Sequence, residues 1–393
     1  MGLTPLSLGF YALMLLGIVD FLAWLILLYR FEAGFRRAPK LGGEYLGQPM
    51  GKVAAVVAAR NEEKTIAECI RSLLSQACVN SVIVVDDAST DKTYEEAKKF
   101  ASNDRVRVLR LEGNGAGKAE ACYFGVNHAD ADWLLFVDAD TRIKPGFVDE
   151  ALVFAEEKGL DALSVVGHLR CPNFWDKVST PFLFGLLNSF IRLDYVCDRG
   201  RKSAYFYGSF ILIKRDVYMK IGGHRAVKDD IVEDRALGSL AKKSGLNICI
   251  AQAPGSVSAE WAPGFRSNVR AMQRVIAPSI NRRVGLGSAF SFALTALFFI
   301  PLLLITLSLS GLTQTLTTIN TIGVFLGVST LVLCAALSVR SAQRIGSNPL
   351  YSLLFILPEA VFSYALWSSV HKVLRGKPIV WRDRTYIYTT QAN

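Results

Sequence analysis

Histidine and cysteine are scarce in this sequence, and neither residue type is grouped. Among 393 residues there are only four histidines and seven cysteines. The cysteines are Cys69, Cys78, Cys122, Cys171, Cys197, Cys249 and Cys334. Zinc and iron–sulfur sites need such ligands in pairs at short spacing, so a built-in site of that kind is excluded. Because thiols in a cytoplasmic protein stay reduced, we expect all seven cysteines to be free.

Two further absences exclude whole classes of function. The glycine-rich turn that ends at Gly117-Lys118 is followed by Ala119, whereas a P-loop requires Ser or Thr at that position. An ATPase of the P-loop class is therefore excluded. The net charge is +10, but no nucleic-acid-binding motif accompanies it and the basic residues flank apolar segments. We expect an anionic membrane surface as the partner of this charge, and no nucleic acid.

Long apolar segments lie near both ends of the chain. The composition is 51% hydrophobic and the mean hydropathy is +0.30, values typical of a protein partly embedded in a membrane. Residues 8–29 are apolar apart from Asp20 and are long enough to span a bilayer. The positive charges follow this segment, which is unlike a signal peptide. Three more apolar segments are expected in the membrane: 289–309, 321–339 and 350–370.

The distribution of positive charge predicts the orientation of the region between these segments. Basic residues from Arg30 to Lys40 precede it and Arg282-Arg283 follow it, which places it in the cytoplasm. Four simple spans would, however, leave the basic tail on the other side. A re-entrant hairpin broken at Pro358 would return the tail to the cytoplasm, and both interpretations stay open.

The region between the membrane segments alternates short apolar runs with helical patterns. Strands are predicted at 53–58, 81–85, 106–111 and 133–137, with helices between them. Helical connections between successive strands predict an α/β fold with a doubly wound, mostly parallel, Rossmann-like sheet. The carboxyl ends of parallel strands meet at one edge, and ligands of open α/β sheets bind there.

Acidic residues follow two of these strands. Asp138 and Asp140 could hold Mg²⁺ or Mn²⁺ against a diphosphate through hard oxygen ligands, although such a pair is also common in solvated turns. Asp87 could accept hydrogen bonds from a nucleoside. Asp87, Ser89 and Asp91 are equally good helix-capping residues.

A series of motifs resembles one enzyme family. The series is Val-Val-Ala-Ala-Arg-Asn-Glu-Glu at 56–63, Val-Val-Asp-Asp-Ala-Ser-Thr-Asp at 84–91, Gly-Lys-Ala at 117–119 and Val-Asp-Ala-Asp at 137–140. Gly208-Ser209, Ile-Gly-Gly-His at 221–224 and Ile-Val-Glu-Asp-Arg-Ala-Leu-Gly at 231–238 follow. Over residues 50–275 the chain resembles the inverting family 2 glycosyltransferases of GT-A fold. The second group of motifs is similar to membrane-bound members that glycosylate ceramide, hopanoids and carotenoid acids.

The resemblance implies a set of site residues. A nucleotide-sugar donor, expected to be a UDP-sugar, would be bound by Ala58, Arg60, Glu62, Asp86, Asp87, Lys118, Asp138, Ala139, Gly208, Gly223, His224, Arg270, Gln273 and Arg274. Asp140, with Asp138, would hold the divalent metal, which screens the charge on the leaving diphosphate. Asp234, next to Glu233 in the catalytic group, would take the proton of the acceptor. A lone acid at a helix start is otherwise an ordinary N-terminal residue.

The chain departs from the family in one region. Many members carry (Gln/Arg)-x-x-Arg-Trp after the base, but residues 268–276 contain no tryptophan and the spacing does not fit. This absence argues against a processive polysaccharide synthase. The roles implied for Gln273 and Arg274 depend on this degenerate motif. The apolar and basic residues there recur at helical spacing, which predicts an amphipathic helix at the membrane surface.

These observations predict a five-part organisation. The parts are a membrane segment with a basic flank (1–40), a catalytic domain (50–262), an interface helix (263–286), membrane segments (287–370) and a basic cytoplasmic tail (371–393). The apolar face of 174–193 favours a lipid acceptor, although packing under the sheet would explain it equally. We therefore expect transfer of one sugar to a hydroxyl or carboxyl of a membrane lipid. The alternatives are a polyprenyl-phosphate glycosyltransferase and a non-catalytic membrane scaffold with a relic fold.

Overall fold

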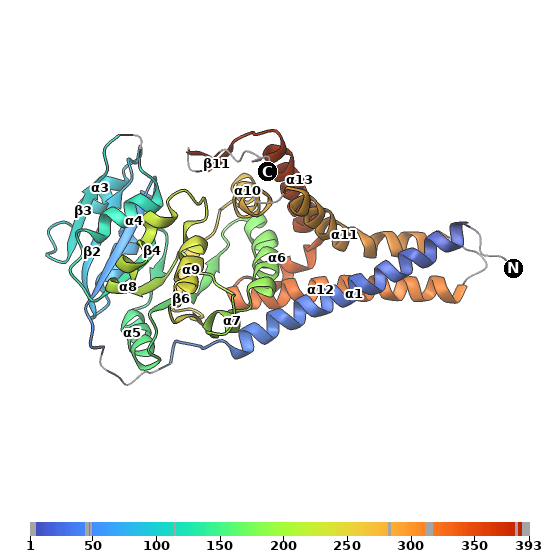
Figure 1. Cartoon of the computed structure of the whole chain (residues 1–393), viewed down its shortest axis with the longest axis horizontal. Coiled ribbons are helices and arrows are strands. Elements are labelled where there is room, and N and C mark those ends of the chain that lie inside the picture. The colour runs from blue at the N-terminus through green and yellow to red at the C-terminus, as the bar shows by residue number, and fades with distance from the viewer. Residues whose placement is uncertain are drawn as a thin grey trace.

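The computed structural model describes residues 5–43, 47, 49–113, 115–281, 284–310, 317–381 and 384–386. An α/β domain lies at one end of an elongated molecule, and three long helices extend away from it (Figure 1). The strands are β1 Val53–Ala59, β2 Val79–Asp86, β3 Val106–Arg110, β4 Trp133–Asp138, β5 Arg142–Ile143, β6 Ala162–Val166, β7 His168–Arg170, β8 Ile211–Lys214, β9 Ile248–Gln252, β10 Val257–Glu260, β11 Ile379–Trp381 and β12 Arg384–Tyr386.

The helices run through both parts of the molecule. They are α1 Pro5–Arg37, α2 Ile66–Leu74, α3 Thr93–Lys98, α4 Lys118–Val126, α5 Phe147–Glu157, α6 Phe174–Ile191, α7 Leu193–Cys197, α8 Arg215–Lys220, α9 Glu233–Lys243, α10 Phe265–Asn281, α11 Val284–Leu309, α12 Thr317–Ile345 and α13 Ile356–Leu374. Two 3₁₀ helices, η1 Gly223–Val227 and η2 Pro349–Leu354, complete the set.

The central sheet has seven strands in the order β3-β2-β1-β4-β8-β6-β9. β3, β2, β1 and β4 are parallel, as the strand–helix alternation predicts. β8 is antiparallel to both β4 and β6, so the sheet is mixed but mostly parallel. This arrangement confirms the predicted α/β class and places the ends of β1, β2 and β4 at one edge.

Two hydrophobic cores cover the two faces of the sheet. In β1, Val53, Ala55 and Val57 belong to one core, whereas Ala54 and Val56 belong to the other. Successive residues of a strand point to opposite faces, so an unbroken apolar run fits a strand that is covered on both sides. The sequence signal for these strands therefore reflects their complete burial.

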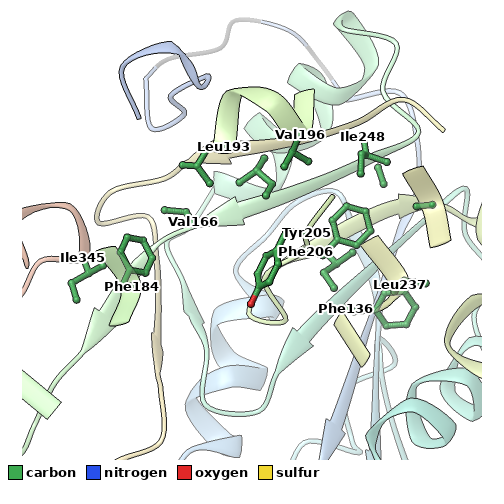
Figure 2. Close-up of a cluster of buried hydrophobic side chains, with 14 of the residues drawn as sticks. Phe136, Val166, Phe184, Leu193, Val196, Tyr205, Phe206, Leu237, Ile248 and Ile345 are labelled. Carbon is green, nitrogen blue, oxygen red and sulfur yellow. The ribbon is translucent and has the colours of Figure 1, made fainter. Parts of the chain in front are cut away.

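The second of these cores continues from the sheet into the long helices. It contains Trp24 of α1, Phe182 of α6 and Phe298 of α11 together with residues of β1 and β6. Figure 2 shows part of it, where Phe184 of α6 and Ile345 of α12 lie near Val166 of β6. Because one apolar cluster joins the two parts, the α/β domain is packed firmly on the helices.

Three helices are long and apolar enough to cross a membrane. They are Leu8–Arg37 in α1, Gly285–Leu309 in α11 and Thr318–Ile345 in α12. The expected fourth segment, 350–370, is divided between η2 and α13. α13 runs on through Pro358, which lies in its first turn, so the chain is not broken at this residue.

α13 lies beside α10, on the same side of the long helices as the α/β domain (Figure 1). With three candidate spans in place of four, the region after α12 would lie on the domain side, and the charge conflict created by four spans would not arise.

The expectation of seven free cysteines is wrong. Cys197 of α7 and Cys249 of β9 form a disulfide, with Cα atoms 4.1 Å apart. The other five cysteines are free, and Cys69, Cys78, Cys122 and Cys334 are buried. The two bonded residues are 52 positions apart in the sequence, and only the packing of α7 against β9 brings them together.

Candidate active site

The carboxyl edge of the parallel strands opens into a large cavity. In the sheet register, Ala58 of β1 pairs with Asp138 of β4, and Ala59 pairs with Asp86 of β2. The cavity has a volume of about 1280 Å³ and extends from this edge to the helices α6, α10, α11 and α13. It has a polar end at the sheet and an apolar end among the helices.

Most of the residues expected at the site line this cavity. Those on its wall are Ala58, Arg60, Glu62, Asp87, Lys118, Asp138, Asp140, Gly208, Glu233, Asp234, Arg270 and Arg274. Asp86, Ala139, Gly223, His224 and Gln273 are not among its lining residues. The fold thus gathers residues from positions 58 to 274 around one space, although their individual roles stay predictions.

Gly208 marks the point at which the main charged groups converge. A Cβ atom at this glycine would lie 2.9 Å from Lys118 Nζ, 3.1 Å from Asp138 Oδ2 and 3.1 Å from Asp234 Oδ2. The Gly208 amide also donates a hydrogen bond of 3.1 Å to Asp234 Oδ2. Glycine leaves open the space between the lysine and the two carboxylates, which any side chain would occupy.

Lys118 joins the two acidic parts of the site. Its Nζ lies 2.7 Å from Asp138 Oδ1 and 2.7 Å from Glu233 Oε1. Burial opposes the charge on Lys118, but Asp138 and Glu233 outweigh this effect and hold its pKa well above the usual value. Burial likewise opposes ionisation of Glu233, yet Lys118 and Arg274 lower its pKa to about 2. Both groups are therefore charged at neutral pH.

Asp234 has the opposite electrostatic character to its neighbour. Burial, and then the negative charge of Glu233, raise the pKa of Asp234 to about 6. Its Oδ1 accepts a hydrogen bond of 2.7 Å from the Arg235 amide at the start of α9. A carboxylate with a pKa near neutrality, exposed to a cavity, is suited to accept a proton.

Asp87 supports the glycine-rich turn before Lys118. Its carboxylate accepts hydrogen bonds from the amides of Ala116, at 2.5 Å, and Gly117, at 2.9 Å. Arg60 lies 3.9 Å from the same carboxylate. A Cβ at Gly115, whose φ is +84°, would clash with Arg60, so the turn requires glycine there. Asp87 thus fixes the loop that carries Lys118 into the cavity.

Asp138 and Asp140 fit a divalent cation as far as their chemistry is concerned. Both line the same cavity, and the side chain of Asp138 is 36% exposed there. Among the described residues, no group of three or more His, Cys, Asp and Glu is placed to hold a metal ion. A cation at this edge would therefore combine the two carboxylates with oxygens of a bound diphosphate, the arrangement typical of Mg²⁺.

The expected residues away from the cavity have structural contacts instead. His224 is buried, packs against Phe136 and has its pKa lowered to about 3 by burial. Its Nδ1 lies 3.0 Å from the Tyr218 hydroxyl. Asp86 is buried and forms an ion pair with Arg110 at 3.2 Å.

Gln273, expected at the donor, instead holds two helices together. It donates a hydrogen bond to Ser368 of α13 and accepts one from Lys372, both 2.9 Å long. Its neighbour Arg274 lines the cavity. Nothing in the spacing of the degenerate motif distinguishes these two residues.

Several cavity residues have no recognisable sequence signal. Tyr205 and Tyr207 line the wall between the acidic groups and the apolar end, and Figure 2 shows the Tyr205 ring directed away from Phe206. The Tyr207 hydroxyl donates a hydrogen bond of 2.6 Å to Asn188 of α6. Trp261 also lines the cavity, although it precedes the region where the family motif carries its tryptophan. Only the tertiary structure brings these aromatic residues to the site.

Comparisons with known proteins agree with this geometry. Residues 54–222 match the family model of Glycosyl transferase family 2. A 4,4'-diaponeurosporenoate glycosyltransferase of Staphylococcus aureus (strain bovine RF122 / ET3-1) is 30% identical over 239 residues, which are 59% of this chain and 63% of that protein. The protein of the same name from strain USA300 has the same identity and coverage. The chain thus spans less than two thirds of these curated relatives.

A solved structure shares the fold. The mannosyltransferase PcManGT from Pyrobaculum calidifontis, determined in complex with GDP-Man and Mn²⁺, superposes with a TM-score of 0.52 at 18% sequence identity. The match covers 92% of this chain and 97% of that one.

Proposed function

We propose that this chain, whose residues 54–222 match the family model of Glycosyl transferase family 2, moves a single sugar from a nucleotide-sugar donor to a membrane lipid. The observation that carries the proposal is the single cavity that joins the acidic edge of the sheet to an apolar chamber among the helices. A hydrophilic donor fits the first end and an apolar acceptor fits the second. The reacting atoms would meet between them, near Gly208.

The donor half of the proposal rests on Lys118 and the two aspartates of β4. A nucleoside diphosphate carries negative charge that must be balanced when it leaves, and a divalent cation at Asp138 and Asp140 would supply that charge. Asp138 Oδ1 forms an ion pair with Lys118 Nζ, 2.7 Å away. Lys118 is thus close enough to bind a diphosphate oxygen once the donor is present. We expect a UDP-sugar as donor.

The acceptor half rests on Asp234. Its carboxylate faces the cavity at the junction of the polar and apolar ends, and its raised pKa makes it a competent base above pH 6. A lipid hydroxyl becomes a nucleophile when this carboxylate removes its proton. A lipid carboxyl would enter in its protonated form, because Glu233 and Asp234 raise the pKa of a third acid beside them. Attack from this side, opposite the diphosphate, inverts the sugar configuration.

The proposed orientation places the α/β domain in the cytoplasm. α1 ends in Arg36 and Arg37, and the last turns of α12 contain Arg340 and Arg344, all at the domain side of the spans. Arg340 and Arg344 both form ion pairs with Glu32 of α1. Positive charge at the cytoplasmic ends is the general rule for membrane helices. The exposed side chains of Arg266 and Arg270 on α10 suit an anionic lipid surface.

The alternative of a polyprenyl-phosphate acceptor fits the charges less well. A phosphate monoester keeps at least one negative charge at neutral pH and would lie beside Asp138, Glu233 and Asp234. It also needs no base. Mild acid distinguishes the products, because a sugar phosphate linked to a polyprenyl chain is released, whereas a glycosidic lipid survives.

Donor binding tests the proposal against a scaffold with a relic fold. We would titrate the purified full chain with UDP- and GDP-sugars by calorimetry, with and without Mn²⁺. We expect metal-dependent binding of one donor, and its loss in Asp140→Asn. The exposed Asp229, which does not line the cavity, provides the matched control Asp229→Asn. Absence of binding for every donor would support the scaffold instead.

A further inference from the structure

The apolar end of the cavity has walls from four helices. α6 contributes Leu186 and Leu187, α11 contributes Phe290 and Leu294, and α13 contributes Leu366. Met272 and Ile276 of α10 complete the lining. We call this space the apolar chamber. Gly285–Leu309 of α11 is a candidate membrane span, so the chamber lies against the part of the molecule that meets lipid.

We call the line along which two of these helices meet a seam. Three of these seams are closed by polar contacts. Asn268 of α10 donates a hydrogen bond of 3.1 Å to Asp176 of α6. Gln273 of α10 donates to Ser368 of α13 at 2.9 Å. Trp367 of α13 donates to Thr295 of α11 at 3.1 Å. A hydrogen bond would have to break in apolar surroundings before any of these three seams could open.

The seam between α6 and α11 is closed by aromatic side chains instead. Phe190 and Phe290 meet edge to face with ring centroids 6.3 Å apart, and Phe182 and Phe298 meet in the same way at 5.7 Å. Within the described parts of α6 and α11, no hydrogen bond joins the two helices. The two contacts are eight residues apart on each helix, which is roughly 12 Å along the axis.

Leu186 and Leu294 lie between the two aromatic contacts and face the chamber. At one end of this interval the closing pair is Phe190, 48% exposed, and Phe290, 52% exposed. At the other end Phe182 and Phe298 are buried together with Trp24. The seam is therefore firmly packed at its deep end, whereas its Phe190–Phe290 end is open to the surroundings of the spans.

We propose that the α6–α11 seam is the portal through which the acceptor enters sideways from the bilayer. The apolar chain of the acceptor passes beside Phe190 and Phe290, lies against Leu186 and Leu294, and brings its reactive oxygen past Tyr205 to Asp234. This inference rests on the proposed function and adds a substrate class to it. The acceptor is a lipid with its reactive group at the end of a slender apolar chain. The reason is that the portal is the gap between two contacts, each made by one pair of phenylalanine side chains.

Rotation of phenylalanine side chains opens such a seam without loss of any hydrogen bond, and the incoming hydrocarbon replaces the aromatic contact with a similar apolar one. Arg30 of α1 flanks the Phe190 end and donates hydrogen bonds to the carbonyl oxygens of Ser189 and Phe190, whereas the route inward from there meets the apolar side chains of Leu186 and Leu294. The same seam thus excludes water from the chamber and admits hydrocarbon.

The test compares two substitutions on α11 in the full chain. Leu294→Trp places extra volume in the chamber, whereas Phe292→Trp changes a side chain that is 66% exposed and does not line it. Transfer of labelled sugar would be measured in membranes at increasing amounts of added native lipid extract. For Leu294→Trp we expect the transfer rate at limiting lipid to fall at least about tenfold, because the larger side chain occupies space that the acceptor chain would fill. The KM for the donor should not change. Phe292→Trp should stay within about twofold of the unsubstituted protein. Equal rates for both variants would overturn the portal.

A second measurement does not depend on catalysis. Parinaric acid, a polyene fatty acid, becomes fluorescent in apolar cavities and serves as the probe with purified protein. We expect Phe292→Trp to bind it as the unsubstituted protein does, and Leu294→Trp to lose this binding while retaining donor binding. Failure of the unsubstituted protein to bind the probe would overturn the chamber assignment. If probe binding follows this pattern but no sugar is transferred, the proposed function fails and the chamber stands.

Discussion

Replacement of Asp234 by asparagine removes the proposed base with the smallest change of shape. The asparagine oxygen can still accept one of the two backbone hydrogen bonds that the carboxylate accepts, from Gly208 at 3.1 Å or from Arg235 at 2.7 Å, whereas its NH₂ group cannot accept the other. The ability to take a proton is lost together with one hydrogen bond at the start of α9. General base catalysis contributes about 10²- to 10⁴-fold to rates. A loss in this range corresponds to roughly 3–5 kcal/mol of transition-state stabilisation.

The assay is the initial rate of sugar transfer to lipid in membranes, measured between pH 5 and 8. The unsubstituted protein should lose activity as the pH falls through about 6, because protonation then removes the base. The sign follows from a raised carboxyl pKa: the active, ionised form predominates only above it. In Asp234→Asn this acidic limb should vanish together with most of the rate. Asp229→Asn, the same change at an exposed position outside the cavity, controls for loss of charge.

A different outcome would refute the reasoning clearly. If Asp234→Asn keeps the rate within about threefold and also keeps the acidic limb, Asp234 is only an acid at the start of α9. A retained rate with an acid-labile product would favour the phosphate acceptor, which needs no base. Thermal unfolding within a few degrees of the unsubstituted protein would show that the fold is unchanged.

Three further predictions follow from contacts in the site. Gly208→Ala should lower the rate of sugar transfer by about tenfold or more. Thermal unfolding should change little, because the added methyl group meets only the flexible ends of Lys118, Asp138 and Asp234. An unchanged transfer rate would contradict the idea that these three groups act together at Gly208. Lys118→Met removes the cation that lies 2.7 Å from both Asp138 and Glu233. Calorimetry should then show that the affinity for the donor is reduced by about tenfold or more. An unchanged affinity would exclude Lys118 from the donor site. Asp140→Asn should abolish the stimulation of transfer by added Mn²⁺ or Mg²⁺ after chelator treatment; an unchanged metal titration would exclude Asp140 as a ligand.

Much of the fold follows from local sequence signals. Residues 53–58 and 133–137 are short, unbroken apolar runs, and complete burial on both faces of the sheet explains that pattern. Asp87, Asp138 and Asp140, which lie at the ends of β2 and β4, likewise line one cavity, because the carboxyl ends of parallel strands must share an edge. These predictions needed no knowledge of long-range packing.

Other features depend on contacts between distant residues and left no local signal. The Cys197–Cys249 disulfide joins two positions that sequence spacing does not relate. His224 and Gln273 belong to recognisable motifs, yet their side chains bind Tyr218 and α13 rather than the cavity. The region 350–370 is as apolar as a membrane span, but the structure divides it into η2 and α13 beside α10.

Transfer of label into lipid tests the central claim most directly. Membranes containing the full chain would be incubated with a panel of radioactive nucleotide sugars, Mg²⁺ or Mn²⁺ and added native lipid extract, beside the Asp140→Asn variant. The proposed function predicts label in organic-extractable, mild-acid-stable lipid from one donor, with the unsubstituted protein only. No extractable label from any donor, in a preparation that binds nucleotide sugar, would contradict transfer to a lipid.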